Sequence, residues 1–597
     1  MTTAVIFDIE VYPDYFDVAF LNADTGVIRH FEMYDGRPFN IELVQATVDQ
    51  HRLVSFNGNN FDVPLLSLAL QGAPCSQLKA VADKIIKQNM KHWTLGIELV
   101  ECDHIDLIEI APGMASLKIY GGRMHAPKMQ DLPFDPDSGI EPGQRAMLRE
   151  YCGNDLQTTL ALYRALLPQI ELRERMSKQY GIDLRSKSDA QIAEAVIVAE
   201  VEKRIKRKLP KVDPFHLAGE TFQYTPPAFI EFATEPMRQA LEVVKVAQFV
   251  IASNGTVTMP KELGDLKIAV GGSVYRMGIG GLHSSEKSAA HVADDRHILV
   301  DRDVASYYPA IILNCGLRPK SMGGHFTAVY RGIVERRLEA KRTGDTVTAD
   351  ALKITINGSF GKFGSPYSKL YSPTLLIQTT VTGQLALLML IEMLGDAGIS
   401  VVSANTDGIV IKCPRELESV MDTLVWEWET ITRFNTEAQQ YVALYSRDVN
   451  NYIAVKPDGK YKVKGAFAPA GLQKNPASEI SVLAAIRFLI KGTPVADTIH
   501  ACQDITKFVT IRTVKGGAMK GDTYLGKAVR WYYALGEAGA LTYKLNGYTV
   551  PRSEGARPLM ELPNIFPTDV DYAWYVGEAL SILEDVGVDS WQPEALA

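Results

Sequence analysis

The chain is 597 residues long, which exceeds the size at which a single hydrophobic core stops growing, so several domains are expected. Hydrophobic residues make up 46% of the chain and charged residues 22%, a composition that is typical of globular proteins and excludes a disordered one. The net charge of −8 does not by itself indicate a nucleic-acid binder, but phosphate contacts come from local basic faces, and carboxylates that bind metals lower the total.

Neither a membrane span, nor a secretory signal, nor a zinc ribbon is expected. No apolar run approaches the roughly 18–20 residues that cross a bilayer, and the N-terminus has no basic start and gains acidic residues at once. The six cysteines include no Cys-x-x-Cys pair, which excludes a zinc ribbon and fits reduced thiols in a cytosol. We therefore expect a cytoplasmic protein that acts away from membranes.

In chain order, residues 1–165 alternate short β-rich runs with helical stretches, as in an α/β unit. A helix is expected from Ser188 into a basic cluster, for which a solvated helix end and contact with a DNA backbone are equally open. Residues 210–262 are rich in proline and glycine and are expected to connect two domains, with one amphipathic helix near Met237–Val250. The basic cluster consists of Lys203, Arg204, Lys206, Arg207, Lys208 and Lys211.

Strands are expected next at Ile298–Asp303 and Ser400–Lys412, with two helices between them, Ala328–Arg342 and Ala349–Phe360, separated by a short glycine turn. After residue 470 the chain mixes helices with a stretch rich in glycine and proline. For the aromatic run Arg530–Tyr533 we expect burial rather than stacking on nucleic acid.

Two carboxylates, Asp8 and Glu10, stand at alternate positions at the end of an apolar strand, so they share a face and can converge on one ion. Such a pair alone is most often two surface acids. Two later segments change this interpretation: Asn57–Asp62 closes another apolar strand, and Tyr151 and Asp155 lie one helical turn apart. Together the acids form a candidate metal site.

These segments resemble, in order, the DxE, Nx3FD and YxxxD motifs of the proofreading exonuclease domain of family B DNA polymerases. Ser116 and Leu117 match an SLxx segment that contacts single-stranded DNA in that family. The resemblance implies that hard oxygen ligands hold two Mg²⁺ or Mn²⁺ ions and that Tyr151 orients the attacking water. The implied ligands are Asp8, Glu10, Asp62 and Asp155, and the implied DNA contacts are Asn57, Ser116 and Leu117.

The segment from Asp303 to Pro309 follows an expected strand and resembles motif A, DxxSLYP, of the same family, with Tyr307 in place of leucine. The resemblance implies that Asp303 is a ligand of both catalytic metals. It also implies that Tyr308 lies beneath the sugar of the incoming nucleotide, where a 2′-hydroxyl would clash. Asp301 shares the face of Asp303, but the motif register favours Asp303.

Arg337 and Lys341 are one helical turn apart, and Lys353 and Asn357 have the same spacing on the following helix. They resemble the family's Rx3K and its motif B, Kx3NSxYG, which implies a fingers hairpin. Three converging cations are what a triphosphate needs for binding and for charge stabilisation during transfer. Two residues depart from motif B, namely Gly358 for serine and Phe360 for tyrosine. Polymerisation is expected to survive these changes, whereas the resemblance leaves the details of nucleotide selection open.

Asp407 lies in a turn between two apolar runs, as in a β-hairpin, and this turn resembles motif C, YGDTDS. Asp407 aligns with the second aspartate, the other shared metal ligand, whereas Asn405 replaces the first. Either the site tolerates a neutral residue at this position, which we favour, or activity is reduced.

Two further segments resemble DNA-binding motifs of the family. Gly280 and Gly281 fit a YxGG-type segment that contacts template, and Asn450-Asn451-Tyr452 falls where KxY grips the primer end. The motif lysine is absent, and Lys460, Lys462 or Lys464, which alternate along a strand, are expected to supply its charge. The expected DNA contacts of this half are Gly280, Gly281, Tyr452, Lys462 and Lys464.

The fold class we predict is α/β multidomain, with an RNase H-like exonuclease followed by a right-hand palm, fingers and thumb. The predicted parts are the exonuclease (1–170), a connecting and template-side region (171–262), the first palm segment (263–320), the fingers (321–365), the second palm segment (366–470) and the thumb with the C-terminal region (471–597). The thumb is assigned by position only.

The predicted function is template-directed DNA synthesis from dNTPs with two Mg²⁺ ions per site, together with 3′→5′ proofreading. The short intervals around Lys353 lack the insertions of protein-primed phage relatives, so a nucleic-acid primer is expected. By the resemblance, compact size suggests a bacteriophage or mobile-element replicase. It is expected to act as a monomer on primer–template DNA, with single-stranded DNA in the exonuclease site. The alternatives are an exonuclease with a decayed polymerase half and a non-catalytic DNA-binding protein.

Overall fold

The computed structural model describes residues 4–210, 213 and 215–588, so Lys211 of the basic cluster lies outside the described residues. The chain forms two compact units of mixed helices and strands, which confirms the α/β multidomain class. Unit 1 comprises Met1–Ser188, Pro469–Leu483 and Ala496–Gly577, and unit 2 comprises Asp189–Ala468, Ala484–Val495 and Glu578–Ala597.

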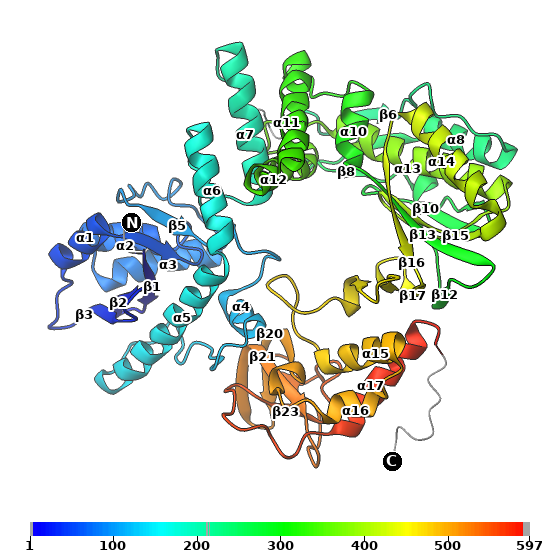
Figure 1. The fold of residues 1–597 in the computed structure, drawn as a ribbon. Helices are drawn as coiled ribbons and strands as arrows, with labels where there is room; N and C mark the ends of the chain where they lie inside the picture. The colour runs from blue at the N-terminus through cyan, green and yellow to red at the C-terminus, as the bar shows by residue number, and fades with distance from the viewer. Residues whose placement is uncertain (1–3, 211–212, 214, 589–597) are drawn as a thin grey trace. The chain divides into compact units, whose positions relative to one another are not determined.

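Unit 1 contains a five-stranded sheet in the order β3-β2-β1-β4-β5 (Figure 1). Strand β1 is antiparallel to β2 and parallel to β4, and β4 is parallel to β5. The strands are β1 (Ala4–Val11), β2 (Tyr15–Asn22), β3 (Ile28–Tyr34), β4 (Arg52–Ser55) and β5 (His104–Asp106). The helices are α1 (Ile41–Gln50), α2 (Asp62–Leu70), α3 (Cys75–Gln88), α4 (Leu117–Arg123), α5 (Arg145–Ala165) and α6 (Leu167–Tyr180).

Alternation along β1 divides the core of unit 1 into two layers, because successive strand residues face opposite sides of a sheet. Phe7 packs into a cluster with α2 and α3 residues such as Leu65 and Leu78. Ile6 faces the other way, into a cluster with Cys152 and Leu156 of α5. The even-numbered residues of β1 therefore face α5.

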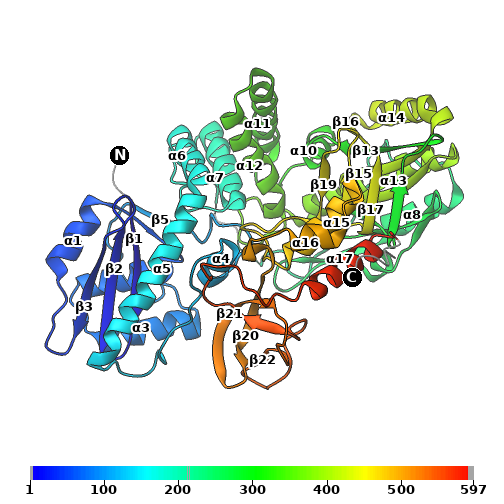
Figure 2. The ribbon, with the colours of Figure 1, turned by 60° about the horizontal axis from the view of Figure 1, so that its bottom comes forward.

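A second sheet of unit 1 is formed by β20 (Thr510–Lys520), β21 (Thr523–Tyr533), β22 (Thr542–Tyr543) and β23 (Ala556–Pro558), in the order β22-β20-β21-β23. Figure 2 shows β20 and β21 next to α4, which contacts both strands. The fully buried Arg530 donates hydrogen bonds to the carbonyl oxygens of Ala126 and Leu559, at 2.8 and 2.7 Å. Trp531, Tyr532 and Tyr533 are buried, as expected.

Unit 2 is built on a seven-stranded sheet in the order β16-β13-β15-β14-β11-β10-β9. Its strands are β9 (Ile268–Val270), β10 (Ser273–Met277), β11 (Leu282–Ser284), β13 (His297–Val304), β14 (Ser400–Asn405), β15 (Gly408–Pro414) and β16 (Thr436–Tyr441). A four-stranded sheet contains β12 (Ala289–Val292), β17 (Ala443–Asp448), β18 (Asn451–Val455) and β19 (Tyr461–Val463), and a three-stranded sheet contains β6 (Thr221–Gln223), β7 (Gln248–Ile251) and β8 (Val257–Thr258).

The remaining helices complete the described chain. They are α7 (Asp189–Ile205), α8 (Glu235–Val246), α9 (Lys261–Gly264), α10 (Tyr307–Asn314), α11 (Gly323–Thr343), α12 (Thr346–Phe363), α13 (Pro373–Asp396), α14 (Glu418–Thr432), α15 (Glu479–Lys491), α16 (Val495–His500) and α17 (Tyr572–Asp585). The helix expected near Met237–Val250 ends at Val246, because Gln248–Ile251 alternates exposed and buried residues and pairs as β7.

Helix α13 is 24 residues long, and its most apolar 18-residue window has a mean hydropathy of 1.6, so by length and composition alone it could span a membrane. Threonine, glutamine and glycine interrupt its apolar runs, which concealed it in the sequence. Of its most apolar window, 83% is buried within the protein. The Trp428 indole donates to the Ala386 carbonyl at 2.7 Å, so α13 is the central core helix of unit 2.

Helices α7, α11 and α12 stand side by side in Figure 1, and each contacts the other two. The two helices predicted between the strands are confirmed as α11 and α12, joined by Gly344 at a φ of 75°. Gly358 lies where α12 meets the start of α7, and a Cβ there would lie 2.5 Å from the Asp189 carbonyl oxygen. This contact explains the departure from serine in motif B.

We expect Gly358→Ala to destabilise unit 2 by roughly 1–3 kcal/mol, because the new methyl group would force two helix backbones apart. Gly361→Ala on the same helix is the matched control, since a Cβ there meets nothing within 4 Å, and it should stabilise the helix by up to about 1 kcal/mol. Urea unfolding of both variants measures the difference. Equal stability of the two variants would contradict the close helix contact.

Candidate active sites

The first candidate site lies in unit 1, where β1 faces α5. Oxygen atoms of Asp8 and Glu10 and the sulfur of Cys152 lie within 4.8 Å of one another. Cys152 is fully buried and follows Tyr151 in the predicted motif, but the sequence analysis assigned it no role. The alternation of β1 therefore brings the two predicted acids to one point beside α5.

Asp62 and Asp155 complete the acidic cluster from two helices. Asp62 is the first residue of α2 and Asp155 lies in the middle of α5, and both are buried. The Oδ1 atom of Asp62 is buried without a hydrogen-bond partner among the described residues. A buried carboxylate oxygen without a partner is costly, so this atom fits the requirements of a metal ligand.

Burial and mutual repulsion raise the pKa values of this cluster. Burial, followed by the charge of Asp155, raises the pKa of Asp8 to about 7. Burial and the charge of Asp8 raise the pKa of Glu10 well above its usual value, and they do the same for Asp62. A divalent cation would reverse these shifts, because an opposite charge favours the ionised form.

Lys118, the third residue of the segment that matches SLxx, supplies a counter-charge to the acidic cluster. Its Nζ forms an ion pair with Asp155 Oδ1 and lies 4.2 Å from the centroid of the Tyr151 ring. Ser116 caps the helix that presents it, with Oγ accepting a hydrogen bond from the Ile119 amide. The signal in the sequence was the residue directly after Ser116-Leu117, the predicted DNA contacts.

The loop that leads to Asp62 is shaped by the buried carboxylate of Asp106. Asp106 accepts hydrogen bonds from the backbone amides of Asn57 and Asn59, at 2.7 and 2.9 Å. Asn57 has a positive φ of 69°, and its Oδ1 accepts a bond from Asn60 Nδ2 at 3.1 Å. The predicted DNA contact Asn57 therefore lies in a loop that is fixed before any ligand binds.

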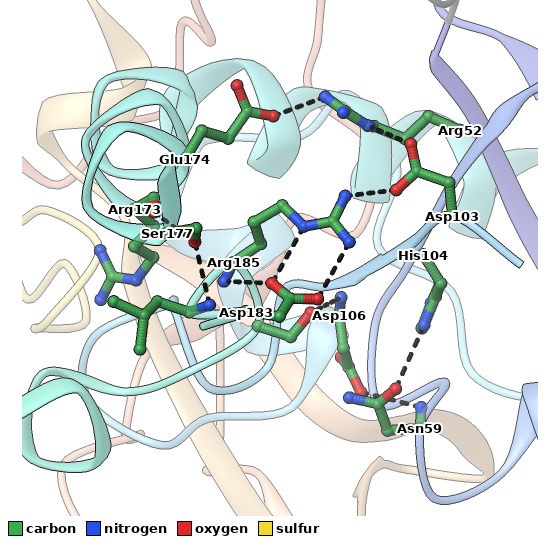
Figure 3. Close-up of polar contacts among 12 residues, drawn as sticks. Arg52, Asn59, Asp103, His104, Asp106, Arg173, Glu174, Ser177, Asp183 and Arg185 are labelled. Carbon is green, nitrogen blue, oxygen red and sulfur yellow. Dashed lines mark hydrogen bonds and ion pairs between the residues drawn. The ribbon is translucent and has the colours of Figure 1, made fainter. Parts of the chain in front are cut away.

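Figure 3 shows His104 and Asp106 beside Asn59 of this loop, with a chain of ion pairs drawn above them, among Glu174, Arg52, Asp103, Arg185 and Asp183. His104 Nδ1 lies 3.2 Å from Asn59 Oδ1, and its Nε2 lies 2.8 Å from Ser55 Oγ. Desolvation, assisted by the positive charge of Arg185, lowers the pKa of His104 to about 4. The imidazole is therefore neutral near pH 7.

The second candidate site lies in unit 2, on neighbouring strands of the seven-stranded sheet. Asp303 pairs with Gly408 in the ladder between β13 and β15, and the Val304 amide donates to the Asp407 carbonyl at 2.7 Å. A Cβ on Gly408 would lie 2.1 Å from Asp303 Oδ1, so a side chain there would displace the Asp303 carboxylate. The hairpin turn therefore places Asp407 next to Asp303.

Lys462 of β19 and Lys464, which follows that strand, partly offset the negative charge of these acids. Burial, followed by the charge of Asp301, raises the pKa of Asp303 to about 6, and Lys462 and Lys464 oppose the shift. Lys462 Nζ lies 3.3 Å from Asp301 Oδ2 and 3.9 Å from Asp303 Oδ2. The buried Asp301 also accepts a hydrogen bond from the Tyr441 hydroxyl at 2.5 Å, which fixes the carboxylate that holds Lys462.

A cavity of about 380 Å³ adjoins this site. Arg337 lines it, donates to Ser306 Oγ at 3.2 Å and has a buried Nε without a partner among the described residues. Lys341 and Lys353 are exposed and do not line the cavity. The lining is Val304, Ser306, Tyr307, Tyr308, Pro309, Tyr330, Arg337, Ile356, Asn357, Phe360 and Asp407.

Tyr308 is fixed from two sides within this cavity. Its ring stacks on Phe360, with centroids 4.3 Å apart and 23° between the planes, and its hydroxyl donates to the Gly280 carbonyl. A Cβ on the neighbouring Gly281 would lie 2.9 Å from Thr406 Oγ1. The predicted template contacts Gly280 and Gly281 therefore pack against the predicted nucleotide contact Tyr308 and against Thr406, which precedes Asp407.

Comparisons with known proteins support a distant relationship to DNA polymerases. No family model matches the sequence. A 132-residue segment is 26% identical to DNA polymerase 1 of Sulfurisphaera ohwakuensis and covers 22% of this chain and 15% of that protein. A 124-residue segment is 27% identical to DNA polymerase 1 of Saccharolobus solfataricus and covers 20% of this chain and 14% of that protein.

The matched segments thus span about one seventh of the curated relatives. Among solved structures, the family B DNA polymerase of the archaeon Pyrobaculum calidifontis aligns over 98% of this chain and 78% of its own, at 16% identity. Its TM-score of 0.42 is too low to establish a shared fold. The curated relatives are archaeal, so they do not support the expected bacteriophage subtype.

The depressed pKa of His104 predicts a pH dependence of stability. Unfolding returns the pKa from about 4 to the ordinary 6.5, so the unfolded chain binds the extra proton between these values. The free energy of unfolding should therefore fall as the pH drops from 6.5 towards 4, by roughly 1–3 kcal/mol from this group. His104→Gln should lose this contribution.

Urea unfolding of wild type and His104→Gln across pH 4–8 measures the effect as a difference between the two proteins, in which other titrating groups cancel. The difference should be constant above pH 7 and should change below 6.5. A difference that stays constant over the whole range would show that His104 titrates normally in the folded protein.

Proposed function

We propose that this chain is a DNA polymerase that extends a nucleic-acid primer along a template with dNTPs and excises mispaired 3′ ends. The single observation behind this proposal is the pair Asp303 and Asp407, placed side by side by one hairpin next to a cavity lined by Arg337. The distant sequence matches to DNA polymerases support the same class.

In the polymerase site, Asp303 and Asp407 would hold two Mg²⁺ ions. Bound ions would activate the primer 3′-hydroxyl and neutralise the departing pyrophosphate. The guanidinium of Arg337 suits a triphosphate, because its fork of donors matches phosphate oxygens. The Tyr308 ring, held by Phe360, would lie under the nucleotide sugar and exclude a 2′-hydroxyl. Lys341 and Lys353 would contact the triphosphate from the exposed faces of α11 and α12.

In the exonuclease site, Asp8, Glu10, Asp62 and Asp155 would hold two Mg²⁺ or Mn²⁺ ions, and Tyr151 would orient the attacking water. The partnerless Asp62 oxygen and the raised pKa values of the cluster support metal binding. The sheet order of unit 1, antiparallel in β3-β2-β1 and parallel in β1-β4-β5, supports the RNase H-like arrangement. Lys118 would lie beside these ligands and contact the scissile phosphate through its ammonium group.

The six predicted parts, from exonuclease to thumb, remain part of this proposal, as do a monomeric state and a cytoplasmic location. The main alternative is an exonuclease whose polymerase half has decayed, because Asn405 and Asn450 replace an aspartate and a lysine of the family. Lys462, 3.9 Å from Asp303, argues for a working polymerase site, since it supplies a cation at the place where one is needed.

The decisive experiment uses a 5′-labelled primer annealed to a longer template, incubated with Mg²⁺, with and without the four dNTPs. Full-length product with dNTPs and shortening without them are expected. Shortening under both conditions would favour the exonuclease alternative. A primer that stays unchanged under both conditions would favour the non-catalytic DNA-binding protein.

Substitutions should separate the two activities. Asp303→Asn is expected to lower primer extension at least roughly 100-fold, because the metal ions that stabilise the transition-state charge would lose a carboxylate ligand. It should leave primer shortening intact. Asp8→Ala combined with Glu10→Ala should do the reverse. Asp295→Asn, an exposed acid just before β13, is the control and should change neither. Loss of both activities in one folded variant would contradict two separate sites.

Metal binding should also be visible without catalysis. Relief of carboxylate repulsion in unit 1 predicts that Mg²⁺ or Mn²⁺ raises the free energy of unfolding by about 3 kcal/mol at roughly 100 times the Kd, and with it the midpoint of thermal unfolding. Asp155→Asn should lose part of this rise, whereas Glu150→Gln, an exposed acid on the same helix, should keep it. Differential scanning fluorimetry with and without chelator measures both variants. An equal rise in both would contradict metal binding by Asp155.

A further inference from the structure

The two clearest departures from the family pattern are in direct contact. Asn405 ends β14 where motif C has its first aspartate, and Asn450 lies in the turn between β17 and β18 where KxY has its lysine. Asn405 Nδ2 donates to Asn450 Oδ1 at 3.2 Å. A negative and a positive residue of the family pattern are thus replaced by two neutral amides that meet each other.

Asn405 is suited to this place as an amide and not as a carboxylate. Its Nδ2 donates to the Val449 carbonyl oxygen at 3.0 Å as well as to Asn450, and its Oδ1 accepts from Thr406 Oγ1 at 3.0 Å. A carboxylate would place an oxygen against both acceptors and lose both bonds, and the bond to the Val449 carbonyl oxygen is part-buried. It would also add a negative charge two residues from Asp407.

The turn that receives these bonds is itself tied to the lysine strand. Asp448 accepts from the Asn450 amide at 2.9 Å and from Asn451 Nδ2 at 2.7 Å. Asn451 Oδ1 accepts from the Ala466 amide at 2.6 Å, just after Lys464. Strand β18, which begins at Asn451, pairs with β19 so that Ala454 lies opposite Lys462.

A continuous set of hydrogen bonds therefore runs from the hairpin of Asp407, through the turn 448–451, to the segment that presents Lys462 and Lys464. We propose that Asn405 and Asn450 are a matched pair of positioning residues: together they hold this turn, and with it the two lysines, in place at the polymerase carboxylates. The two departures are one coupled replacement of a charged pair by a neutral pair, not two steps of decay. This inference rests on the proposed polymerase function.

A double-mutant cycle tests the coupling. Asn405→Asp alone and Asn450→Lys alone should each lower kcat for primer extension roughly 10-fold or more, because each introduces an unmatched charge at the turn. The combined variant, in which a carboxylate again faces an ammonium, should recover most of the loss. The KM for dNTP should change little, since neither side chain lines the nucleotide cavity.

Asn254→Asp is the matched control for the chemical change. Asn254 is exposed and uses only its Oδ1, which accepts from the Thr256 amide at 3.0 Å and from its hydroxyl at 2.7 Å, so a carboxylate keeps both bonds. This control should extend primers at the wild-type rate. The 3′→5′ shortening activity of each variant is a second internal control, because the acids assigned to it belong to unit 1.

Each result has one meaning. Losses that simply add in the combined variant would overturn the coupling, and faster extension by Asn405→Asp would overturn the idea that the amide is suited to its place. If wild type extends no primer, the proposed function fails, and the cycle is measured on the midpoint of thermal unfolding. There, recovery in the combined variant supports the pair and additivity overturns it.

Discussion

Carboxylates held close together by the fold are the constraint on which both units depend. Asp8, Glu10, Asp62 and Asp155 in unit 1 repel one another and resist ionisation, and burial also raises the pKa values of Asp303 and Asp407 in unit 2. A flexible chain would let such groups separate into solvent. The sheets prevent this, because strand pairing fixes each acid at a set place in a hydrogen-bonded ladder.

Each unit also provides a lysine from a distant segment to offset this repulsion. Lys118 reaches Asp155 from the helix after Ser116, and Lys462 reaches Asp301 and Asp303 from β19. Both lysines are held by geometry independent of any ligand: a helix cap in one case, and strand pairing with the buried Asp301 in the other. The charge arrangement is therefore built into the folded chain before metal or nucleic acid binds.

Packing also explains departures from the family pattern that the sequence presented as isolated oddities. Gly358 is required because α7 runs against α12, and Phe360 replaces tyrosine where its ring stacks on Tyr308. Asn405 and Asn450 meet through their amides. In each case, the neighbour that accounts for the residue is distant in sequence, so a motif comparison alone could not reveal it.

The sequence by itself determined the local features: the alternation that puts Asp8 and Glu10 on one face, the helical turn between Tyr151 and Asp155, and the hairpin around Asp407. These features follow from the side-chain period of two residues in strands and 3.6 residues in helices, which the local backbone conformation sets. Only the tertiary structure decided that Cys152 adjoins the acids, that Lys462 contacts Asp303, and that the apolar helix α13 is buried in a core. Contacts between remote segments depend on how sheets and helices pack, and no local period encodes them.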